Sequence, residues 1–396
     1  ELGWQARGLR FTDRLQESTT IVGRDTLGNS VTVVARSLDD TATLNTAQGA
    51  LWLEDAVDVL AEPGRLRLVP SLRADYFAYN SELTVSPRLN AVLRMSENVT
   101  WTAGLGVYHQ APTYRELRGD PAPGQTVGQL LDGDLASQRA VQAVVGLTRF
   151  FPSRRLGLRA EAYYKRLTNL ISYDVENIRV DYSGENDSEG YAGGFDVQLR
   201  GELVPGLESW VNYGFLLTEE RFFAPDRAAF GADAAGEAEF DRATARFVSR
   251  GGGAYVPRPT DRRHNLTFFV QDNVPGDDTW SLHIRTLYGT GVPTTGQAST
   301  VISNVSVFEP GPRNQLRLPS YVRFDLGATK RLRVGTAVSG GPLAMLATVE
   351  VLNVFNQDNT IAYSWVEQNN GGRRTFLAVP TRLTPRTLNV RVRLDF

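Results

Sequence analysis

The side chains best suited to acid–base or metal chemistry are three histidines, and their positions argue against such a site. His109, His264 and His283 lie far apart and show no metal-ligand spacing. The chain has no cysteine, so it offers neither a thiolate metal site nor a disulfide framework. It also shows no nucleophile motif, phosphate-binding loop or carboxylate pair in a fitting context. We therefore predict no metal, no cofactor and no catalytic activity, and expect hydrogen bonding from His264.

One acidic run offers a different chemistry. Residues 184–189 (GENDSE) bring three carboxylates close together, and calcium prefers such oxygen ligands. The twelve-residue calcium-loop pattern is absent, however, and most acidic runs are solvated loops. We interpret the run as a loop, and calcium stays an open alternative.

Arginines recur with carboxylates at alternate positions of apolar segments. Between Leu158 and Tyr164, for example, Arg159 and Glu161 alternate with apolar residues, so the charges share one face of an extended strand. Such residues can pair with one another in a wet interior, or they can contact a solute or a polar plug. As inward-facing polar residues we predict Arg159, Glu161, Arg200, Arg285, Arg323 and Asp325.

The last ten residues (TLNVRVRLDF) show the element that would carry these faces. Five apolar residues from Leu388 to Phe396 alternate strictly with polar ones. A soluble strand with one solvated face would alternate in the same way. An edge strand with five large apolar groups would invite aggregation, unless lipid covers that face and neighbouring strands pair both edges. A closed membrane barrel meets both conditions.

The composition fits a barrel and excludes a helical membrane protein. The 396 residues are 41% hydrophobic with a mean hydropathy of -0.26. No window approaches the ~18 consecutive apolar residues that a membrane helix requires. Barrel strands escape this test because only alternate residues face lipid. The formal net charge of -2 gives no basic surface of the kind that binds nucleic acid.

About fourteen alternating segments follow along the chain, each near the ~10 residues of a membrane strand. Short Pro/Gly turns follow the even-numbered segments and long polar loops follow nearly every odd one, as in outer-membrane barrels. A soluble sandwich or propeller, the alternative, has no reason to segregate its loops in this way. We predict an all-β, transmembrane, antiparallel up-and-down β-barrel. The predicted segments are 2–11, 50–60, 66–76, 89–93, 100–108, 141–150, 156–164, 195–199, 210–217, 266–270, 280–288, 322–329, 345–355 and 387–396.

Aromatic residues divide between two expected roles. Rings near strand ends favour the lipid headgroup level, and these are Trp52, Trp101, Trp210, Trp280, Tyr76, Tyr108, Tyr164 and Tyr288. Loop aromatics are better placed to meet a ligand. The predicted ligand-binding residues are Tyr108, Tyr114, Arg115, Tyr255 and Trp365.

Six stretches, taken in order, resemble the carboxy-terminal part of TonB-dependent outer-membrane receptors. They are VSPRL (85–89) with GLGVYHQAPTYREL (104–117), LRAEAYYKRLTNLI (158–171), RPTDRRHNL (258–266), GTGVP (289–293), VEVLNVFN (349–356) and the terminal aromatic. Each stretch is loose alone, but six in the family's order are specific. A plug domain, a TonB-contacting segment and a signal peptide are not recognisable.

The resemblance implies a bacterial outer-membrane receptor that takes up a scarce ligand, such as an iron chelate, a cobamide or a glycan, with TonB-coupled energy. Its implied partners are the TonB complex, which would act through a missing N-terminal region, the barrel-assembly machinery, the lipid bilayer and the ligand. Family barrels have more strands, so we expect residues 1–396 to be a barrel domain truncated at its N-terminal side, part of a 22-stranded barrel without its plug. The alternative is a complete, smaller barrel that acts as a passive channel.

Phe396 generates the first prediction. In the family, a terminal lipid-facing aromatic is read by the barrel-assembly machinery, and Phe396 matches by position and by its phase with Val392 and Leu394. We expect its deletion to leave the protein degraded in the periplasm, while the barrel refolded from urea into detergent keeps nearly its full stability. A mere anchoring role, worth about 1.5–3 kcal/mol of burial, predicts the reverse. In that case Phe396→Ala reaches the outer membrane at normal levels and loses only unfolding stability.

Overall fold

The computed structural model describes residues 1–24, 30–118, 131, 133–176, 179–204, 206–302, 305–336, 342–370, 373–383 and 385–395. Nearly all regular structure in these ranges is β-strand, with one α-helix, α1 (Ala234–Ser249). Within these ranges, no helix combines the length and the apolar character needed to cross a membrane. The prediction of an all-β chain is confirmed. Phe396 lies outside the described residues.

Fourteen strands follow one another in a single antiparallel sheet, and each pairs with the next. They are β1 (Leu2–Arg24), β2 (Ser30–Glu54), β4 (Leu66–Phe77), β5 (Glu82–Ser96), β6 (Val99–Gln110), β7 (Gln138–Phe151), β8 (Leu156–Leu170), β11 (Ser188–Val204), β12 (Leu207–Phe222), β14 (His264–Val274), β15 (Asp277–Gly289), β20 (Tyr321–Thr336), β21 (Pro342–Leu352) and β24 (Thr387–Asp395). Two short strands, β3 (Val57–Asp58) and β13 (Val256–Pro257), pair with β4 and β12. This up-and-down order agrees with the predicted fold class, and β1 and β24 form the two edges of the sheet.

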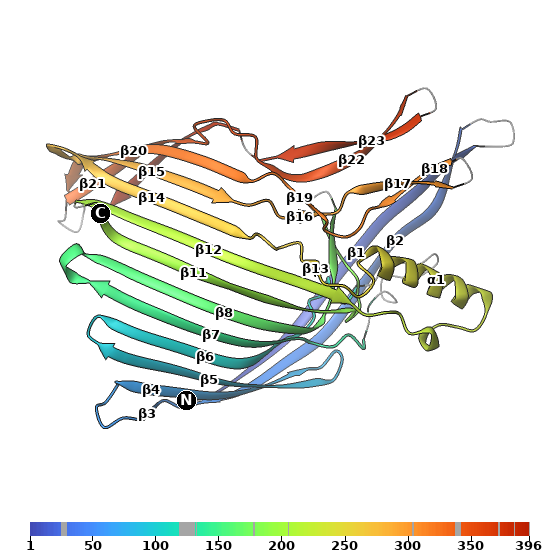
Figure 1. Ribbon diagram of the computed structural model, residues 1–396, viewed down its shortest axis with the longest axis horizontal. Helices are drawn as coiled ribbons and strands as arrows, with labels where there is room; N and C mark the ends of the chain where they lie inside the picture. Colours follow the sequence, from blue (N-terminus) through green and yellow to red (C-terminus); the bar gives the residue numbers. More distant parts are fainter. Residues whose placement is uncertain are drawn as a thin grey trace.

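The connections are segregated by length. Short turns such as 97–98, 152–155 and 275–276 lie at one end of the curved sheet, together with both chain termini (Figure 1). The other end carries the long connections, together with the short β1–β2 and β4–β5 connections. Four small hairpins and α1 project from the long-loop end. The hairpins pair β9 (Tyr173–Glu176) with β10 (Arg179–Tyr182), β16 (Pro293–Thr294) with β19 (Leu316–Arg317), β17 (Gln297–Ile302) with β18 (Val305–Pro310), and β22 (Thr360–Asn370) with β23 (Arg373–Arg382).

One face of the sheet is apolar and exposed. Side chains of residues in cross-strand register share a face, so the outward set can be followed from strand to strand. On β15, Leu282 is 49% exposed, and on β6 Leu105 is 58% exposed. The same face carries Leu72, Val85, Val145, Tyr164, Phe195, Tyr288, Val322, Leu326, Val349, Leu388, Val390, Val392 and Leu394. An exposed apolar surface of this extent suits contact with lipid.

The opposite face carries the charged residues, most of them in ion pairs. Arg159 Nη2 donates to Glu161 Oε1 at 2.7 Å, and Arg200 lies 3.8 Å from Glu208 near the start of β12. The most enclosed carboxylate is that of Asp325, whose side chain is fully buried. Arg285 and Arg323 each approach it to 2.7 Å, and the backbone N–H of Asn353 donates to it at 2.9 Å. The sequence-predicted inward residues therefore form short-range pairs along the wall.

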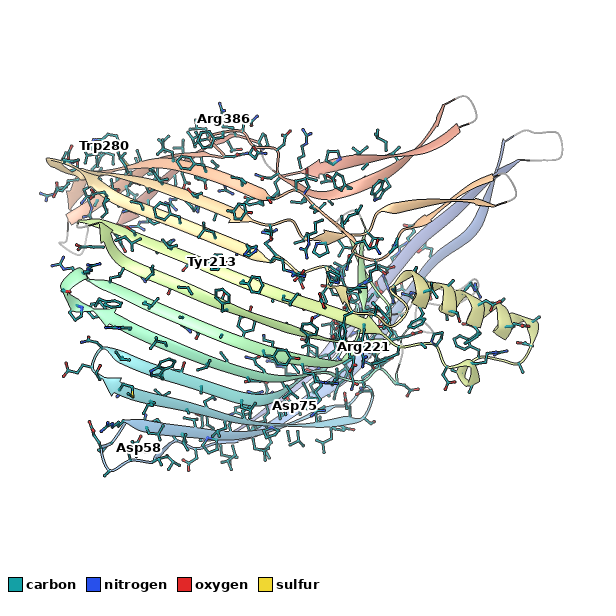
Figure 2. The ribbon with its side chains drawn as sticks, in the orientation of Figure 1. Asp58, Asp75, Tyr213, Arg221, Trp280 and Arg386 are labelled. Atoms are coloured by element: carbon teal, nitrogen blue, oxygen red, sulfur yellow. The ribbon has the colours of Figure 1, made fainter. Side chains whose placement is uncertain are left out.

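Three aromatic residues expected at the membrane interface, Trp52, Tyr108 and Trp210, lie instead on the inner face. Trp52 lies under the guanidinium of Arg73 at 5.4 Å, and Trp210 is in register with Arg200. For the two tryptophans the prediction was wrong because β2 and β12 carry large residues on both faces, so alternation alone does not set their phase. Trp280 does lie at the short-turn end (Figure 2), with Lys330 Nζ 4.9 Å from its ring centroid.

Several strands extend beyond their predicted bounds. The segment 89–93 is the middle of the longer β5, where Pro87 conceals the pattern because proline is unusual within strands. The strands β1 and β2 remain paired from Leu2 with Leu53 to Arg24 with Ser30, with one register shift between Thr19 and Thr20. Their polar outer halves show no apolar alternation, which a strand needs only where it meets lipid. In the other direction, β2 ends at Glu54 and not at Leu60.

The long connections share a small hydrophobic core of their own. Leu117 and Leu135 from the β6–β7 connection are buried together with Ile171 from the β8–β11 connection. Leu44, Tyr79, Leu131 and Tyr182 pack against them. The loop end is therefore a packed layer across the end of the sheet.

Candidate functional site

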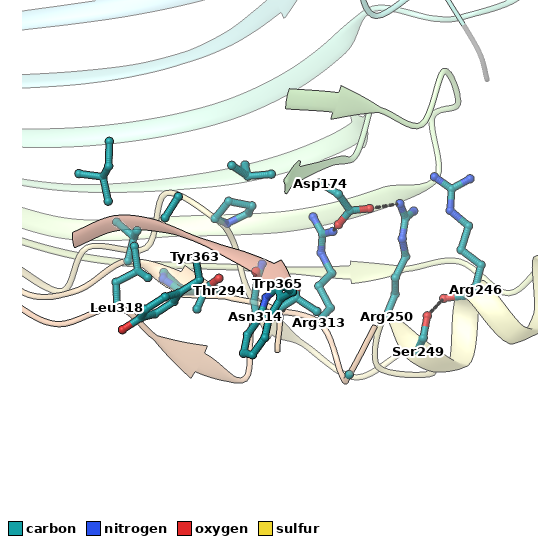
Figure 3. Close-up of a pocket in the computed structure, with 18 residues that line it drawn as sticks. Asp174, Arg246, Ser249, Arg250, Thr294, Arg313, Asn314, Leu318, Tyr363 and Trp365 are labelled. Atoms are coloured by element: carbon teal, nitrogen blue, oxygen red, sulfur yellow. Dashed lines mark hydrogen bonds and ion pairs between the residues drawn. The ribbon is translucent and has the colours of Figure 1, made fainter. Parts of the chain in front are cut away.

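The long connections enclose a cavity of about 400 Å³ (Figure 3). Its walls come from β9, the end of α1, the segments around β16 and β19, and β22. Three arginines line it, Arg246, Arg250 and Arg313, together with a single carboxylate from the described residues, Asp174. The lining is therefore basic.

The helix α1 positions two of these arginines. Its alanine-rich and glutamate-rich sequence favours a helix, and Asp233 caps the start by accepting from the backbone N–H of Gly236 at 2.9 Å. Arg246 lies in the last turn and Arg250 is the C-cap. Gly251–Gly253 follow with φ of 111°, 58° and 86°, conformations that favour glycine and turn the chain away from the helix axis.

Arg313 is fixed by a buried carboxylate. Its Nε and Nη2 donate to Glu220 Oε1 at 3.2 and 2.8 Å, and these side chains are only 3% and 1% exposed. Arg258 Nε donates to the other oxygen of Glu220 at 3.1 Å. Arg313 Nη2 also donates to the carbonyl oxygen of Tyr173 at 2.6 Å. Because a buried charge needs compensation, Glu220 joins the end of β12 to two separate connections.

Arg250 is fixed in a similar way by the acidic run. Its Nη1 donates to Asp187 Oδ2 at 2.8 Å and to Ser172 Oγ at 3.0 Å. Asp187 also accepts from the backbone N–H and the hydroxyl of Ser172, at 3.1 and 2.6 Å. The remaining amino group, Nη2, donates to Asp174 Oδ2 at 2.8 Å. The carboxylates of Asp187 and Glu189, considered above for calcium, thus have arginine partners.

One aromatic ring joins the two guanidinium groups. The Cζ atoms of Arg250 and Arg313 lie 4.9 and 5.1 Å from the ring centroid of Phe222, which is buried. The negative face of a ring attracts cations, most strongly where water is excluded. Phe222, the last residue of β12, therefore holds two positive charges near each other and beside the cavity.

A second buried carboxylate fixes the neighbouring wall. Asp261 is fully buried and accepts from Arg263 Nε at 2.8 Å, from Arg317 Nη2 and from the backbone N–H of Thr218 at 3.0 Å. Arg317 belongs to β19, so this cluster ties that hairpin to the outer end of β12. Asn314 adds a hydrogen bond to the carbonyl oxygen of Pro257 at 2.7 Å.

Across the cavity, β22 supplies an aromatic wall. Tyr363 and Trp365 both line it, with ring centroids 6.3 Å apart (Figure 3). Trp365 is one of the five residues predicted from the sequence to bind a ligand. Guanidinium groups opposite planar rings can hold a molecule that has both an anionic group and a flat surface.

Tyr114, another predicted ligand residue, faces β1 instead. Its hydroxyl donates to Asp13 at 3.0 Å and its ring stacks on Phe11 at 5.3 Å. Burial, together with the hydrogen bond to Asp13, raises the pKa of Tyr114 to about 12. Tyr114 therefore joins the β6–β7 connection to β1.

The other three predicted residues also lie away from the cavity. Tyr108 lies under the guanidinium of Arg88 at 4.5 Å on the inner wall. Tyr255 packs edge-on against Tyr191 at 5.4 Å, near the loop end, and Arg115 is exposed. The structure thus brings Trp365 to the cavity and leaves the remaining four dispersed.

Sequence reasoning missed the arginine cluster itself. Arg250 and Arg313 occur in SRGGG (249–253) and GPRN (311–314), single charges set among glycine and proline in long loops. That context was the available signal, because such turns give a side chain a fixed direction. Their partners Asp174, Asp187 and Glu220 are distant in the sequence and carry no local signature.

The faces of the sheet, the segregated connections and the loop layer define a class of protein, an outer-membrane barrel whose long loops gather at one end of its wall. Residues 2–356 match the family model described as TonB dependent receptor-like, beta-barrel. The chain belongs to this family, and its location is the bacterial outer membrane.

Solved structures show the same fold at low sequence identity. The outer membrane transporter YddB from Escherichia coli aligns with a TM-score of 0.58 and 11% identity, over 99% of this chain and 50% of that one. The Ferric-Catecholate import receptor Fiu from K12 E. coli aligns with a TM-score of 0.54 and 14% identity, over 99% of this chain and 52% of that one. The pyoverdine receptor FpvA from Pseudomonas aeruginosa aligns with a TM-score of 0.53 and 15% identity, over 92% of this chain and 44% of that one. The chain thus spans about half the length of these structures. No curated protein matches the sequence.

Two substitutions on β12 that make the same chemical change test the role of the buried Glu220. Glu220→Gln removes a charge that two arginines need, so we expect the loop layer to open more easily, by about 2–3 kcal/mol. Glu208→Gln makes the same chemical change at a side chain that is 64% exposed and 3.8 Å from its arginine, which we expect to cost under about 0.5 kcal/mol. Amide hydrogen exchange at residues 311–318 measures the difference. Equal exchange in the two variants would show that the ion pairs do not hold the layer.

Proposed function

We propose that this chain forms part of a receptor that binds a ligand at its external loops and passes it across the outer membrane with energy supplied through TonB. The observation that carries the proposal is the basic cavity with its aromatic wall, enclosed by the long connections at one end of the sheet. A pre-formed concave site with a few fixed charges and rings is typical of small-molecule binding. No catalytic step is assigned to it.

The ligand class follows from the cavity and from the compared proteins. Of the candidates iron chelate, cobamide and glycan, the three lining arginines favour an anionic iron chelate. Two of the similar proteins agree, since Fiu is a ferric-catecholate import receptor and FpvA was solved bound to pyoverdine. Trp365 would contact the ligand directly. Tyr255 and Arg115, which are exposed, remain proposed contacts for a ligand larger than the cavity.

The inner wall would act after binding. Arg159, Glu161, Arg200, Arg285, Arg323 and Asp325 are proposed to face the passage and whatever plug occupies it, and Tyr108 with Arg88 adds an aromatic and cationic contact there. The proposed partners are the TonB complex, the barrel-assembly machinery acting on Phe396, and the lipid bilayer on the apolar face. Nucleic acid is not among them.

A larger barrel remains our proposal for the intact receptor. Within the described residues, β1 and β24 each pair with one neighbour and leave an open edge. Unpaired backbone groups at an edge are costly in hydrocarbon, so further strands between these edges would complete the wall. The 22-stranded closure and the domain assignment, 1–396 as one barrel domain without its plug, stay predictions.

The alternative function is a passive channel, and energy coupling separates it from a receptor. Cells that express the full-length receptor are given a ⁵⁵Fe tris-catecholate complex, with and without a protonophore. We expect uptake in the presence of the protonophore to fall to that of cells without the receptor, because nothing recognised in this sequence binds a nucleotide as an energy source. Uptake that persists, together with passage of unrelated solutes of similar size, would favour diffusion through a channel.

A further inference from the structure

Asp174 differs from the other carboxylates of the arginine cluster in its exposure. Its side chain is 39% exposed, compared with 16% for Asp187 and 1% for Glu220. Asp174 is also the single carboxylate, among the described residues, that lines the cavity. Figure 3 shows it between Arg250 and Arg313, with each of them directed at it.

Both arginines also have partners other than Asp174. Arg313 uses Nε and Nη2 for Glu220, and Arg250 uses Nη1 for Asp187 and Ser172. Each then has one amino group directed at Asp174, Nη1 from Arg313 and Nη2 from Arg250. Two fixed guanidinium groups therefore share one exposed carboxylate, and each oxygen of that carboxylate accepts from one of them.

The segment that carries Asp174 lies outside the main sheet and is held there by side-chain contacts, such as that of Tyr182 with the small loop core. It belongs to the β9–β10 hairpin, whose four-residue strands pair with each other and not with the main sheet. A carboxylate that leaves two arginines regains water easily when it is already partly exposed. An outside anion that takes its place preserves the charge balance of the buried arginines, so the exchange costs little.

We propose that Asp174 occupies the position of a ligand's anionic group, and that an anionic, ring-bearing ligand displaces it and releases the β9–β10 hairpin. The ligand would present a carboxylate or similar oxyanion to Arg250 and Arg313, and a planar ring to Tyr363 and Trp365. The inference rests on the proposed function, which brings a ligand to the cavity. It adds a chemical class for the ligand and a link between its binding and the position of one external hairpin.

The test uses the full-length receptor in detergent and a simple probe, isophthalate, with isophthalamide as its neutral match. If Asp174 competes with the probe, Asp174→Asn raises the affinity for isophthalate roughly tenfold, because charged hydrogen bonds to the arginines no longer have to be broken. Binding of isophthalamide stays unchanged. Asp358→Asn is the control, since Asp358 is an exposed carboxylate paired with Arg382 at 2.8 Å that does not line the cavity. It removes the same charge and leaves both affinities as they were.

Hydrogen exchange of the hairpin gives a second readout. Isophthalate should speed exchange at residues 173–176 and 180–182 in the unmodified receptor, whereas Asp174→Asn should show fast exchange without any probe. Weaker or unchanged isophthalate binding in Asp174→Asn overturns the inference, because Asp174 would then support the arginines or play no part in binding. Equal binding of isophthalate and isophthalamide also overturns it, since charge would not be recognised.

The two proposals fail separately. Isophthalate binding in detergent needs no energy coupling, so a negative result with protonophore-sensitive iron uptake intact overturns only the displacement of Asp174. If the protonophore does not reduce uptake but isophthalate binds as expected, the energised mechanism is contradicted and the anion site is still supported.

Discussion

The constraint on which this structure depends is that backbone amides and carbonyls within hydrocarbon must find their hydrogen-bond partners in the protein. The antiparallel path from β1 to β24 meets it by pairing each strand with the next. Successive side chains of a strand point to opposite faces, and one face of the sheet meets lipid. Strand residues therefore alternate between lipid-facing and inward-facing positions along the sequence. Leu282 and Leu326 face outward, while Arg285 and Asp325, which lie an odd number of positions away from them on the same strands, face inward.

Ion pairs contribute differently to stability along the inner wall and at the loop end. Along the inner wall, Arg159 and Glu161 remain 59% and 31% exposed, so their pairing contributes little to stability. At the loop end, Arg313 and Glu220 are almost completely buried, and loss of either partner would leave a charge without compensation. The wall is therefore held by its backbone and the loop layer by its ion pairs and its small apolar core. A chemical change at one exposed carboxylate such as Asp174 can alter loops without disturbing strands.

The sequence predicts the wall much better than the site. Period-two alternation marks residues such as Leu156 to Tyr164 locally, and all fourteen predicted segments correspond to strands of the sheet. Alternation fails where lipid no longer imposes it, in the outer halves of β1 and β2, and where both faces carry large residues, as around Trp210. The cavity depends on pairs such as Arg313 with Glu220 and with Asp174, which lie 93 and 139 residues apart. The fold brings such partners together, and no local sequence pattern predicts them.

The apolar face of this sheet meets lipid, while the charged face meets an aqueous interior. The chain has no cysteine, so single cysteines can be placed from Ser281 to Leu287 on β15 without competing sites in it. Each is spin-labelled in lipid bilayers, and collisions with oxygen and with a water-soluble nickel complex are measured. We predict a period of two, with Leu282, Ile284 and Thr286 accessible to oxygen and Ser281, His283 and Arg285 accessible to nickel. Equal access of the nickel complex to all these positions would contradict a membrane-spanning wall.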